Sequence, residues 1–179
     1  MPTMNIAKSV DGHGFLVKAR SGLEEWPRLL SESYTAVSLM ENDLSELPLR
    51  LICPKLQILL LNKNEYLEKI PDSFLQSLNE LRVLDLSETD ISLLPQSFDL
   101  LTSLRALYLD NCVSITDISM VGKLTKLEIL SMRDIELEEL SREIGDLTNL
   151  RVLDINGGDI ARIPSKLISR LHGLIVPGI

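Results

Sequence analysis

Four side chains in this sequence could support nucleophilic catalysis. They are the thiols of Cys53 and Cys112 and the imidazoles of His13 and His172, the only cysteines and histidines of the chain. A thiol becomes a strong nucleophile when a histidine within hydrogen-bonding distance accepts its proton. The chemistry therefore depends on whether the fold brings a cysteine next to a histidine.

Two carboxylates, Asp85 and Asp154, are a second candidate for catalysis. A pair of carboxylates can cleave a glycosidic bond when about 5 to 9.5 Å separate them. Metal chemistry finds less support, because no Cys or His spacing is typical of zinc and no stretch has the ligand order of a calcium-binding loop. Whether the two aspartates come this close depends on the secondary-structure elements that carry them.

A repeated unit determines where these side chains lie. Its clearest copy, LRVLDLSETDISLLP, runs from residue 81 to residue 95. Leu84 and Leu86 have the period of two that places side chains on one face of a strand, and the later apolar residues are spaced for a chain that folds back. Such a unit cannot bury its apolar row without stacked copies. The copies begin 22 to 25 residues apart, at Tyr34, Leu56, Leu81, Leu104, Leu127, Leu150 and Leu174.

This period is that of leucine-rich repeats. It predicts an α/β fold, a right-handed solenoid with a curved parallel sheet on its concave side and short helices or 3₁₀ turns on its convex side. Residues 1–33 do not repeat and are expected to form an N-terminal cap or junction, with Trp26 covering the first coil. Residues 34–179 are expected to form the repeat domain, with six full repeats and a truncated seventh. Self-association is expected through the uncapped apolar edge of that seventh repeat, at Leu174, Ile175 and Ile179.

The repeats argue against catalysis. Cys112 occupies an inward-facing position of its unit, whereas His172 lies on a convex return segment, so their side chains should not meet. Asp85 and Asp154 share a concave column but lie three strands apart, roughly 14 Å at the usual strand spacing. We predict that the protein is not an enzyme and uses no cofactor or metal ion.

The composition of the chain limits which classes of binding partner are expected. The formal net charge of −8 lacks the basic excess of a nucleic-acid-binding protein, so no nucleic acid is expected. No apolar run approaches the length of a membrane span, and the N-terminus lacks a long apolar signal core, so no membrane association is expected. Two cysteines and no N-x-S/T sequon fit a reducing compartment, and we predict a cytoplasmic protein.

Three stretches carry a resemblance to a known family. GHGFLVKARSGLEEWP (residues 12–27), YTAVSLMENDLSELP and CPKLQILLLNKN are similar to the junction between the nucleotide-binding module and the repeats of coiled-coil-type plant disease resistance proteins. The phosphate-binding loop of that module is absent, since Gly122-Lys123 is followed by Leu124. The Met-His-Asp motif is also absent. The resemblance therefore implies the repeat region alone, which senses pathogen proteins and restrains the nucleotide-binding module. The alternative is an intracellular leucine-rich-repeat scaffold or adaptor that has no nucleotide-binding partner.

A protein partner is expected to bind the concave face. The partner would be a pathogen effector, a guarded host protein or the nucleotide-binding module. Tyr108 stands at the centre of this face, and exposed aromatic residues there are frequent binding hot spots. Lys63 lies between Glu41 and Glu88, and neighbouring-strand pairs of this kind are also an ordinary solubilising device. The candidate binding residues are Leu60, Asp85, Tyr108, Asp110, Ser131, Arg133, Asp154 and Asn156.

Overall fold

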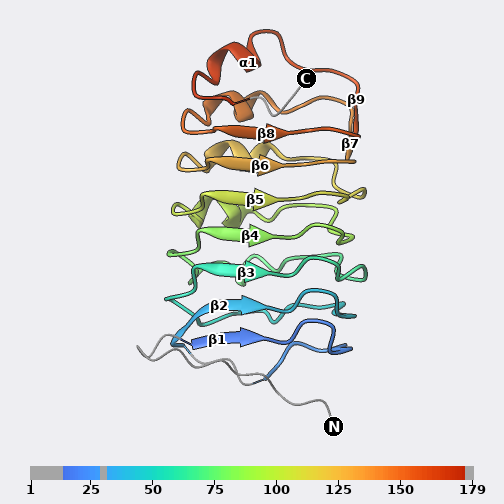
Figure 1. The fold of residues 1–179 in the computed structure, drawn as a ribbon, viewed down its shortest axis with the longest axis vertical. Helices are drawn as coiled ribbons and strands as arrows, with labels where there is room; N and C mark the ends of the chain where they lie inside the picture. The colour runs from blue at the N-terminus through green and yellow to red at the C-terminus, as the bar shows by residue number, and fades with distance from the viewer. Residues whose placement is uncertain (1–13, 29–31, 176–179) are drawn as a thin grey trace.

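The computed structural model describes residues 14–28 and 32–175. Their coils stack into a solenoid, and one strand from each coil joins a seven-stranded parallel sheet (Figure 1). Sequential pairing of neighbouring coils confirms the predicted architecture. The strands, in sheet order, are β1 (Gly14–Val17), β2 (Tyr34–Ser38), β3 (Ile58–Leu60), β4 (Val83–Asp85), β5 (Ala106–Tyr108), β6 (Ile129–Ser131) and β8 (Val152–Asp154).

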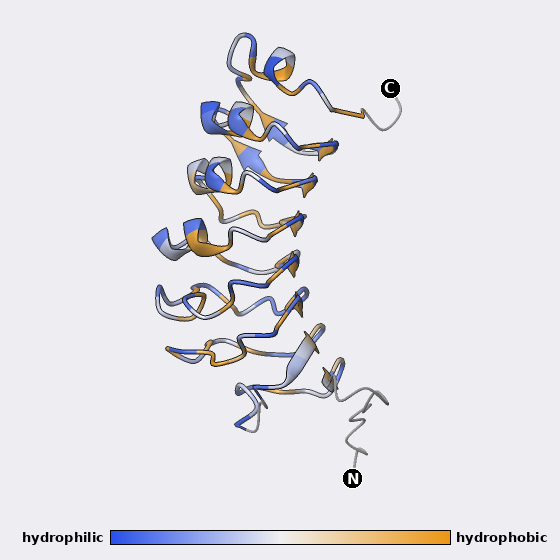
Figure 2. Ribbon diagram, turned by 90° about the vertical axis from the view of Figure 1, so that its left-hand side faces the viewer, coloured by the Kyte–Doolittle hydropathy of each residue, from blue (hydrophilic) through white to orange (hydrophobic). Residues whose placement is uncertain are grey.

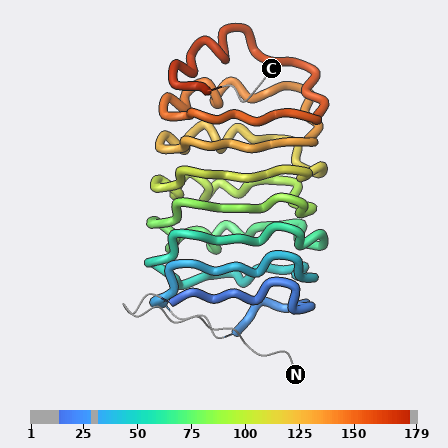
Figure 3. The backbone as a smooth tube through the Cα atoms, in the orientation of Figure 1, coloured from blue at the N-terminus to red at the C-terminus, as the bar shows by residue number. Residues whose placement is uncertain are grey.

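Hydrogen bonding between coils continues beyond these short strands. The Leu86 amide donates to the carbonyl oxygen of Tyr108 at 3.0 Å, and the Glu88 amide donates to that of Asp110 at 2.8 Å. Equivalent bonds recur from coil to coil, so the same position of every repeat lies beside its counterparts (Figure 3). This strict register turns each sequence position into a column across the molecule.

One column has an unusual backbone that the sequence did not predict. Seven residues of this column have positive φ. Each of them lies three positions after the last residue of the large-sheet strand in its coil. A non-glycine residue in this left-handed region is strained by contact between Cβ and the backbone, so the sharp turn out of the strand must require it. The φ values are 52° at Arg20, 52° at Glu41, 59° at Lys63, 55° at Glu88, 57° at Asn111, 56° at Asp134 and 79° at Gly157.

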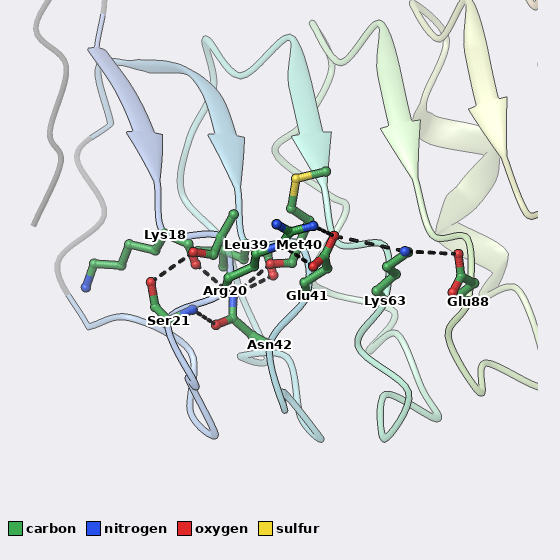
Figure 4. A network of polar contacts seen from close by, with 10 residues as sticks. Lys18, Arg20, Ser21, Leu39, Met40, Glu41, Asn42, Lys63 and Glu88 are labelled. Atoms are coloured by element: carbon green, nitrogen blue, oxygen red, sulfur yellow. Dashed lines mark hydrogen bonds and ion pairs between the residues drawn. The ribbon is translucent and has the colours of Figure 1, made fainter. Parts of the chain in front are cut away.

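Aliphatic side chains fill the interior. Buried asparagine side chains form hydrogen bonds with the backbone of their own and the adjacent coil. Asn64 is fully buried. Its Nδ2 donates to the carbonyl oxygens of Leu39 at 3.0 Å and Leu61 at 2.7 Å, and its Oδ1 accepts from the Leu44 amide at 3.1 Å. Asn42 makes the corresponding bonds one coil earlier (Figure 4). These bonds satisfy backbone groups that have no sheet partner.

The last two coils replace this side-chain bonding with backbone bonding. Ile135 and Gly158 occupy the asparagine position and offer no side-chain hydrogen bond. There the chain forms a second, two-stranded parallel sheet of β7 (Glu136–Leu137) and β9 (Asp159–Ile160). A Cβ at residue 158 would lie 2.2 Å from the Ile135 carbonyl oxygen, so this close approach requires glycine.

The convex side carries short helical turns, as predicted. Figure 2 shows them on the side opposite the sheet strands. Each turn buries an apolar pair of its return segment, such as Phe98 with Leu101 and Ile144 with Leu147. In the described part of the chain, the turns are three 3₁₀ helices, η1 (Gln96–Leu100), η2 (Ser119–Lys123) and η3 (Arg142–Asp146), and one α-helix, α1 (Leu167–Arg170).

The two ends of the described chain extend the same stack. Strand β1 pairs with β2 and buries Leu16 in the common core, so the segment expected to be a cap contributes a coil to the sheet. Trp26 packs edge-on against Phe74 with ring centroids 5.5 Å apart. At the other end Ile175 is 64% exposed. Ile179 lies outside the described residues, and self-association through this end stays a prediction.

Candidate functional site: the concave face

Strand pairing brings the candidate binding residues together in two adjacent columns. The first column follows the pairing register through Ser38, Leu60, Asp85, Tyr108, Ser131 and Asp154. The second column lies two residues further along and contains Asp110, Arg133 and Asn156. Because side chains alternate along a strand, both columns project from the face opposite the buried leucines.

A hydrogen-bonded network fixes the C-terminal half of these columns. Asp110 Oδ1 accepts from Ser131 Oγ at 2.6 Å and from the Arg133 amide at 3.0 Å. Asp110 Oδ2 accepts from Arg133 Nε at 2.9 Å and Nη2 at 2.8 Å, a two-pronged ion pair. Arg133 Nε also lies 4.0 Å from Asp154 Oδ2, and Asp154 Oδ1 accepts from Asn156 Nδ2 at 2.7 Å. Five side chains on three successive coils therefore hold one another in place.

Asp110 is only 7% exposed, so it orients Arg133 instead of presenting its own carboxylate. Burial pushes the pKa of Asp110 upward, but hydrogen bonds from Ser131 and Arg133 and the positive charge of Arg133 outweigh burial and lower it. Asp85, one strand away, has the opposite balance. Burial raises the pKa of its carboxyl more than the hydrogen bonds from Ser87 lower it. The surroundings of Asp85 therefore disfavour the ionised form of its carboxyl group.

Tyr108 lies between Asp85 and Ser131 in the first column and is half-buried. Its neighbours along the strand, Leu107 and Leu109, are buried in the core. The backbone of Tyr108 is thus held between both adjacent coils, while part of its side chain stays accessible. This placement is the one that a central aromatic contact residue needs.

A third column, not predicted from the sequence, is entirely apolar. It lies two residues before the first column and crosses the seven described strands of the large sheet. Its members alternate with the buried leucines, so strand alternation would have revealed it. Phe15 and Ile58, each 38% exposed, are its most accessible residues. The column consists of Phe15, Ala36, Ile58, Val83, Ala106, Ile129 and Val152.

The candidate nucleophiles are unsuited to catalysis. Cys112 is fully buried, and its Sγ lies 3.1 Å from the Leu86 carbonyl oxygen and 3.7 Å from Thr89 Oγ1. Burial raises the pKa of the Cys112 thiol, and burial likewise raises that of Cys53. His172 is exposed, and His13 lies outside the described residues. Within residues 14–28 and 32–175, no cluster of three or more His, Cys, Asp or Glu side chains could hold a metal ion.

This stacked parallel sheet, with one coil per repeat, defines a protein of the leucine-rich-repeat class. The family model described as "Leucine-rich repeat region" matches residues 44–176, and the chain belongs to this family. The repeat regions of the family mediate protein binding, and their fold is generally non-enzymatic.

Curated relatives connect the chain to plant disease resistance. It is 34% identical to the Disease resistance protein At4g27190 of Arabidopsis thaliana over 94% of this chain and 18% of that protein. It is 41% identical to the Probable disease resistance protein At4g27220 of the same plant, over 66% of this chain and 13% of that protein. The chain thus spans less than a fifth of the length of these relatives.

A solved structure supports the fold independently. The leucine-rich-repeat protein LIC12759 of Leptospira interrogans is 26% identical, with a TM-score of 0.76 over 89% of this chain and 41% of that one. Within the part of the chain that the structure describes, no helix has the length and apolar character needed to cross a lipid bilayer.

Proposed function

We propose that this chain is a protein-recognition module of plant defence, and that its concave face binds the partner. The partner would be a pathogen protein, a guarded host protein or a nucleotide-binding module that the repeats restrain in the cytoplasm. The relatives named as disease resistance proteins support this role. So does the family, whose repeat regions bind proteins.

The network around Arg133 is the observation that carries the proposal. Asp110 sits on one side of Arg133 and Asp154 on the other, which restricts a side chain that is otherwise long and flexible. The Arg133 side chain remains 54% exposed, so a fixed guanidinium is presented to solvent one coil from the half-buried Tyr108. Holding such groups before binding lowers the entropy that a partner must overcome.

Replacement of Tyr108 by alanine tests the proposal. Tyr108→Ala should leave the melting temperature nearly unchanged, because the ring does not fill the core, yet it should weaken partner binding by about 2 kcal/mol or more. Binding would be measured in a pull-down against a nucleotide-binding module from a plant resistance protein and against candidate pathogen proteins. Tyr66→Ala is the matched control, since Tyr66 is exposed on a loop away from the sheet. Equal binding by both variants would contradict a concave recognition site centred on Tyr108.

A further inference from the structure

The centre of the concave face carries more negative than positive charge. The two columns of the candidate site contain the carboxylates of Asp85, Asp110 and Asp154 but only one cation, Arg133. Two of the carboxylates share that cation, since Arg133 Nη2 lies 2.8 Å from Asp110 Oδ2 and Arg133 Nε lies 4.0 Å from Asp154 Oδ2. Among the described residues, Asp85 belongs to no ion pair. One carboxylate of the concave face is therefore left without a positive partner.

The cation of the adjacent coil is engaged elsewhere. Lys63 follows the strand next to that of Asp85, and its Nζ lies 4.0 Å from Glu41 Oε1 and 3.8 Å from Glu88 Oε1 (Figure 4). Glu41 pairs in turn with Arg20. These ion pairs alternate in sign from coil to coil and neutralise one another. The row therefore offers no spare positive charge to Asp85.

Asp85 also differs from Asp110 in how its carboxylate is held. Asp110 is buried and receives hydrogen bonds from Ser131 and Arg133, whereas Asp85 is half-buried and Ser87 alone donates to it, with the Ser87 amide 3.0 Å from Asp85 Oδ1. Burial raises the pKa of Asp85, and the nearby charge of Asp110 acts in the same direction. A positive charge brought to the carboxylate from outside would favour its ionised form.

The side chains on either side of Asp85 suit a basic side chain. Strand pairing places Leu60 directly on one side of Asp85 and Tyr108 directly on the other, and all three are half-buried, so each is partly open to solvent. Lysine and arginine have an apolar stem and a cationic head. The stem can lie over Leu60 while the head meets the carboxylate, and an aromatic ring such as that of Tyr108 attracts a cation over its face.

We infer that Leu60, Asp85 and Tyr108 form a subsite for one lysine or arginine side chain of the protein partner. This inference rests on the proposed function and specifies the chemistry of the partner group that meets the centre of the concave face. The bound cation supplies the ion pair that Asp85 lacks within the described chain. The formal net charge of −8 acts in the same direction, because it attracts basic segments of a partner during encounter.

Selection of short peptides tests the inference without a known partner. A phage-displayed library of random peptides would be selected on the immobilised 179-residue chain. We expect the enriched peptides to share a lysine or arginine, and their binding should weaken about tenfold with Asp85→Asn, as for the loss of one charge pair. Asp99→Asn is the matched control, because it removes the same charge from an exposed position in η1 on the convex side. It should bind the peptides as the parent chain does.

A double-mutant cycle shows whether the basic residue of the peptide meets Asp85 itself. The enriched peptide would be synthesised with norleucine in place of its basic residue, which keeps an apolar stem and removes the charge. This change should weaken binding to the parent chain about tenfold and binding to Asp85→Asn hardly at all, because only the parent chain has the charge pair to lose. Asparagine removes a half-buried charge that burial disfavours, so Asp85→Asn should melt no lower than the parent chain, and its weaker binding cannot come from unfolding.

The possible outcomes separate this inference from the proposed function. The inference is overturned if no peptide is enriched, if the enriched peptides lack a basic residue, or if norleucine weakens binding to the parent chain and to Asp85→Asn equally. It is also overturned if Asp99→Asn weakens binding as much as Asp85→Asn, since the attraction would then come from net charge alone. Peptides that lose binding with Tyr108→Ala but not with Asp85→Asn would overturn the inference and leave the proposed function standing. Peptides that bind both variants as they bind the parent chain would contradict both.

Discussion

Neighbouring aspartates of the concave face have opposite effects on folding. Asp110 receives hydrogen bonds from Ser131 and from both the amide and the guanidinium of Arg133, and these bonds lower its pKa although burial acts against them. Asp85 is bonded by Ser87 alone, and burial dominates to raise its pKa. The ionised form of Asp110 therefore stabilises the fold, while the ionised form of Asp85 opposes it.

Asp85→Asn should stabilise the protein at neutral pH. Asparagine keeps an oxygen that can accept the Ser87 amide hydrogen bond, but it removes the buried charge. In the parent chain the folded pKa of Asp85 lies above its unfolded value, so the penalty is present above the folded pKa and disappears below the unfolded one. The gain from Asp85→Asn should accordingly fade as the pH falls through that range. Urea unfolding across a pH series would measure it.

Asp110→Asn is the matched control for that experiment. Its folded pKa lies below the unfolded value, so the stability from its charge is complete above the unfolded pKa, about 3.9, and is lost as the pH falls through the folded pKa. This variant should destabilise the protein at neutral pH, and its effect should also diminish in acid. Equal effects of the two substitutions at neutral pH would contradict the contrast drawn between the two sites.

At the scale of the strand, alternation decides which side chains are structural. Leu84 in β4 is buried between the adjacent coils of β3 and β5, whereas Val83 beside it faces the concave side and is half-buried. Every strand of the large sheet repeats this division. A substitution at one strand position should therefore differ sharply in effect from the same substitution at the next.

Leu84→Asp should unfold the repeat array, whereas Val83→Asp should leave it folded. A carboxylate at residue 84 would be buried without a partner, which costs several kcal/mol or forces the group to bind a proton. At residue 83 the same carboxylate can reach water. Circular dichroism and thermal melting of the two variants would compare them. A native spectrum and melting point for Leu84→Asp would show that the strand register is wrong.

Features that depend only on position within the repeat could be predicted from the sequence. Spacing of leucines predicted the strands, the buried face and the two polar columns that contain Tyr108 and Arg133. It could not predict the positive φ of Glu41, Lys63 and Glu88, because these residue types have no preference for that conformation and the turn between coils imposes it. Only Asn111, Asp134 and Gly157, which tolerate it, carry a local signal.

Other features depend on which atoms find a partner once the coils are packed. The Ser38 hydroxyl remains unpaired, whereas the Ser131 hydroxyl in the same column donates to Asp110. Both residues are serines at equivalent repeat positions, so residue type alone cannot separate them. The difference comes from the preceding coil, which supplies the Asp110 carboxylate to Ser131 but has Ala19, whose side chain forms no hydrogen bond, at the equivalent position beside Ser38. This difference between the two hydroxyls could therefore not be predicted from single repeats.

Across the whole molecule, charge is divided between the two edges of the sheet. The coils stack one above the other (Figure 3). Exposed carboxylates at equivalent repeat positions therefore lie along the edge where the strands end. They are Asp43, Glu65, Asp90, Glu136 and Asp159. The edge where the strands begin carries mainly basic side chains, including Lys55, Arg82, Arg105, Lys126 and Arg151. Among the described residues, none of the five carboxylates is in an ion pair, so neighbouring coils repel one another along that edge.

Glu65 lies where this repulsion is greatest. Reversing the charge of its side chain tests whether the repulsion destabilises the fold. It lies between Asp43 and Asp90 of the adjacent coils, with coils spaced about 4.8 Å apart. Glu65 also borders two open hollows of about 300 and 430 Å³, so a longer side chain can be accommodated. Glu65→Lys should raise the melting temperature by roughly 1 to 3 °C at low salt, and the gain should shrink at high salt as screening weakens both the repulsion and its reversal. Glu128→Lys is the control, because it breaks an existing pair with Arg105 and should lower the melting temperature. A Glu65→Lys protein that melts at or below the parent temperature in low salt would show that the acidic edge carries no repulsive strain.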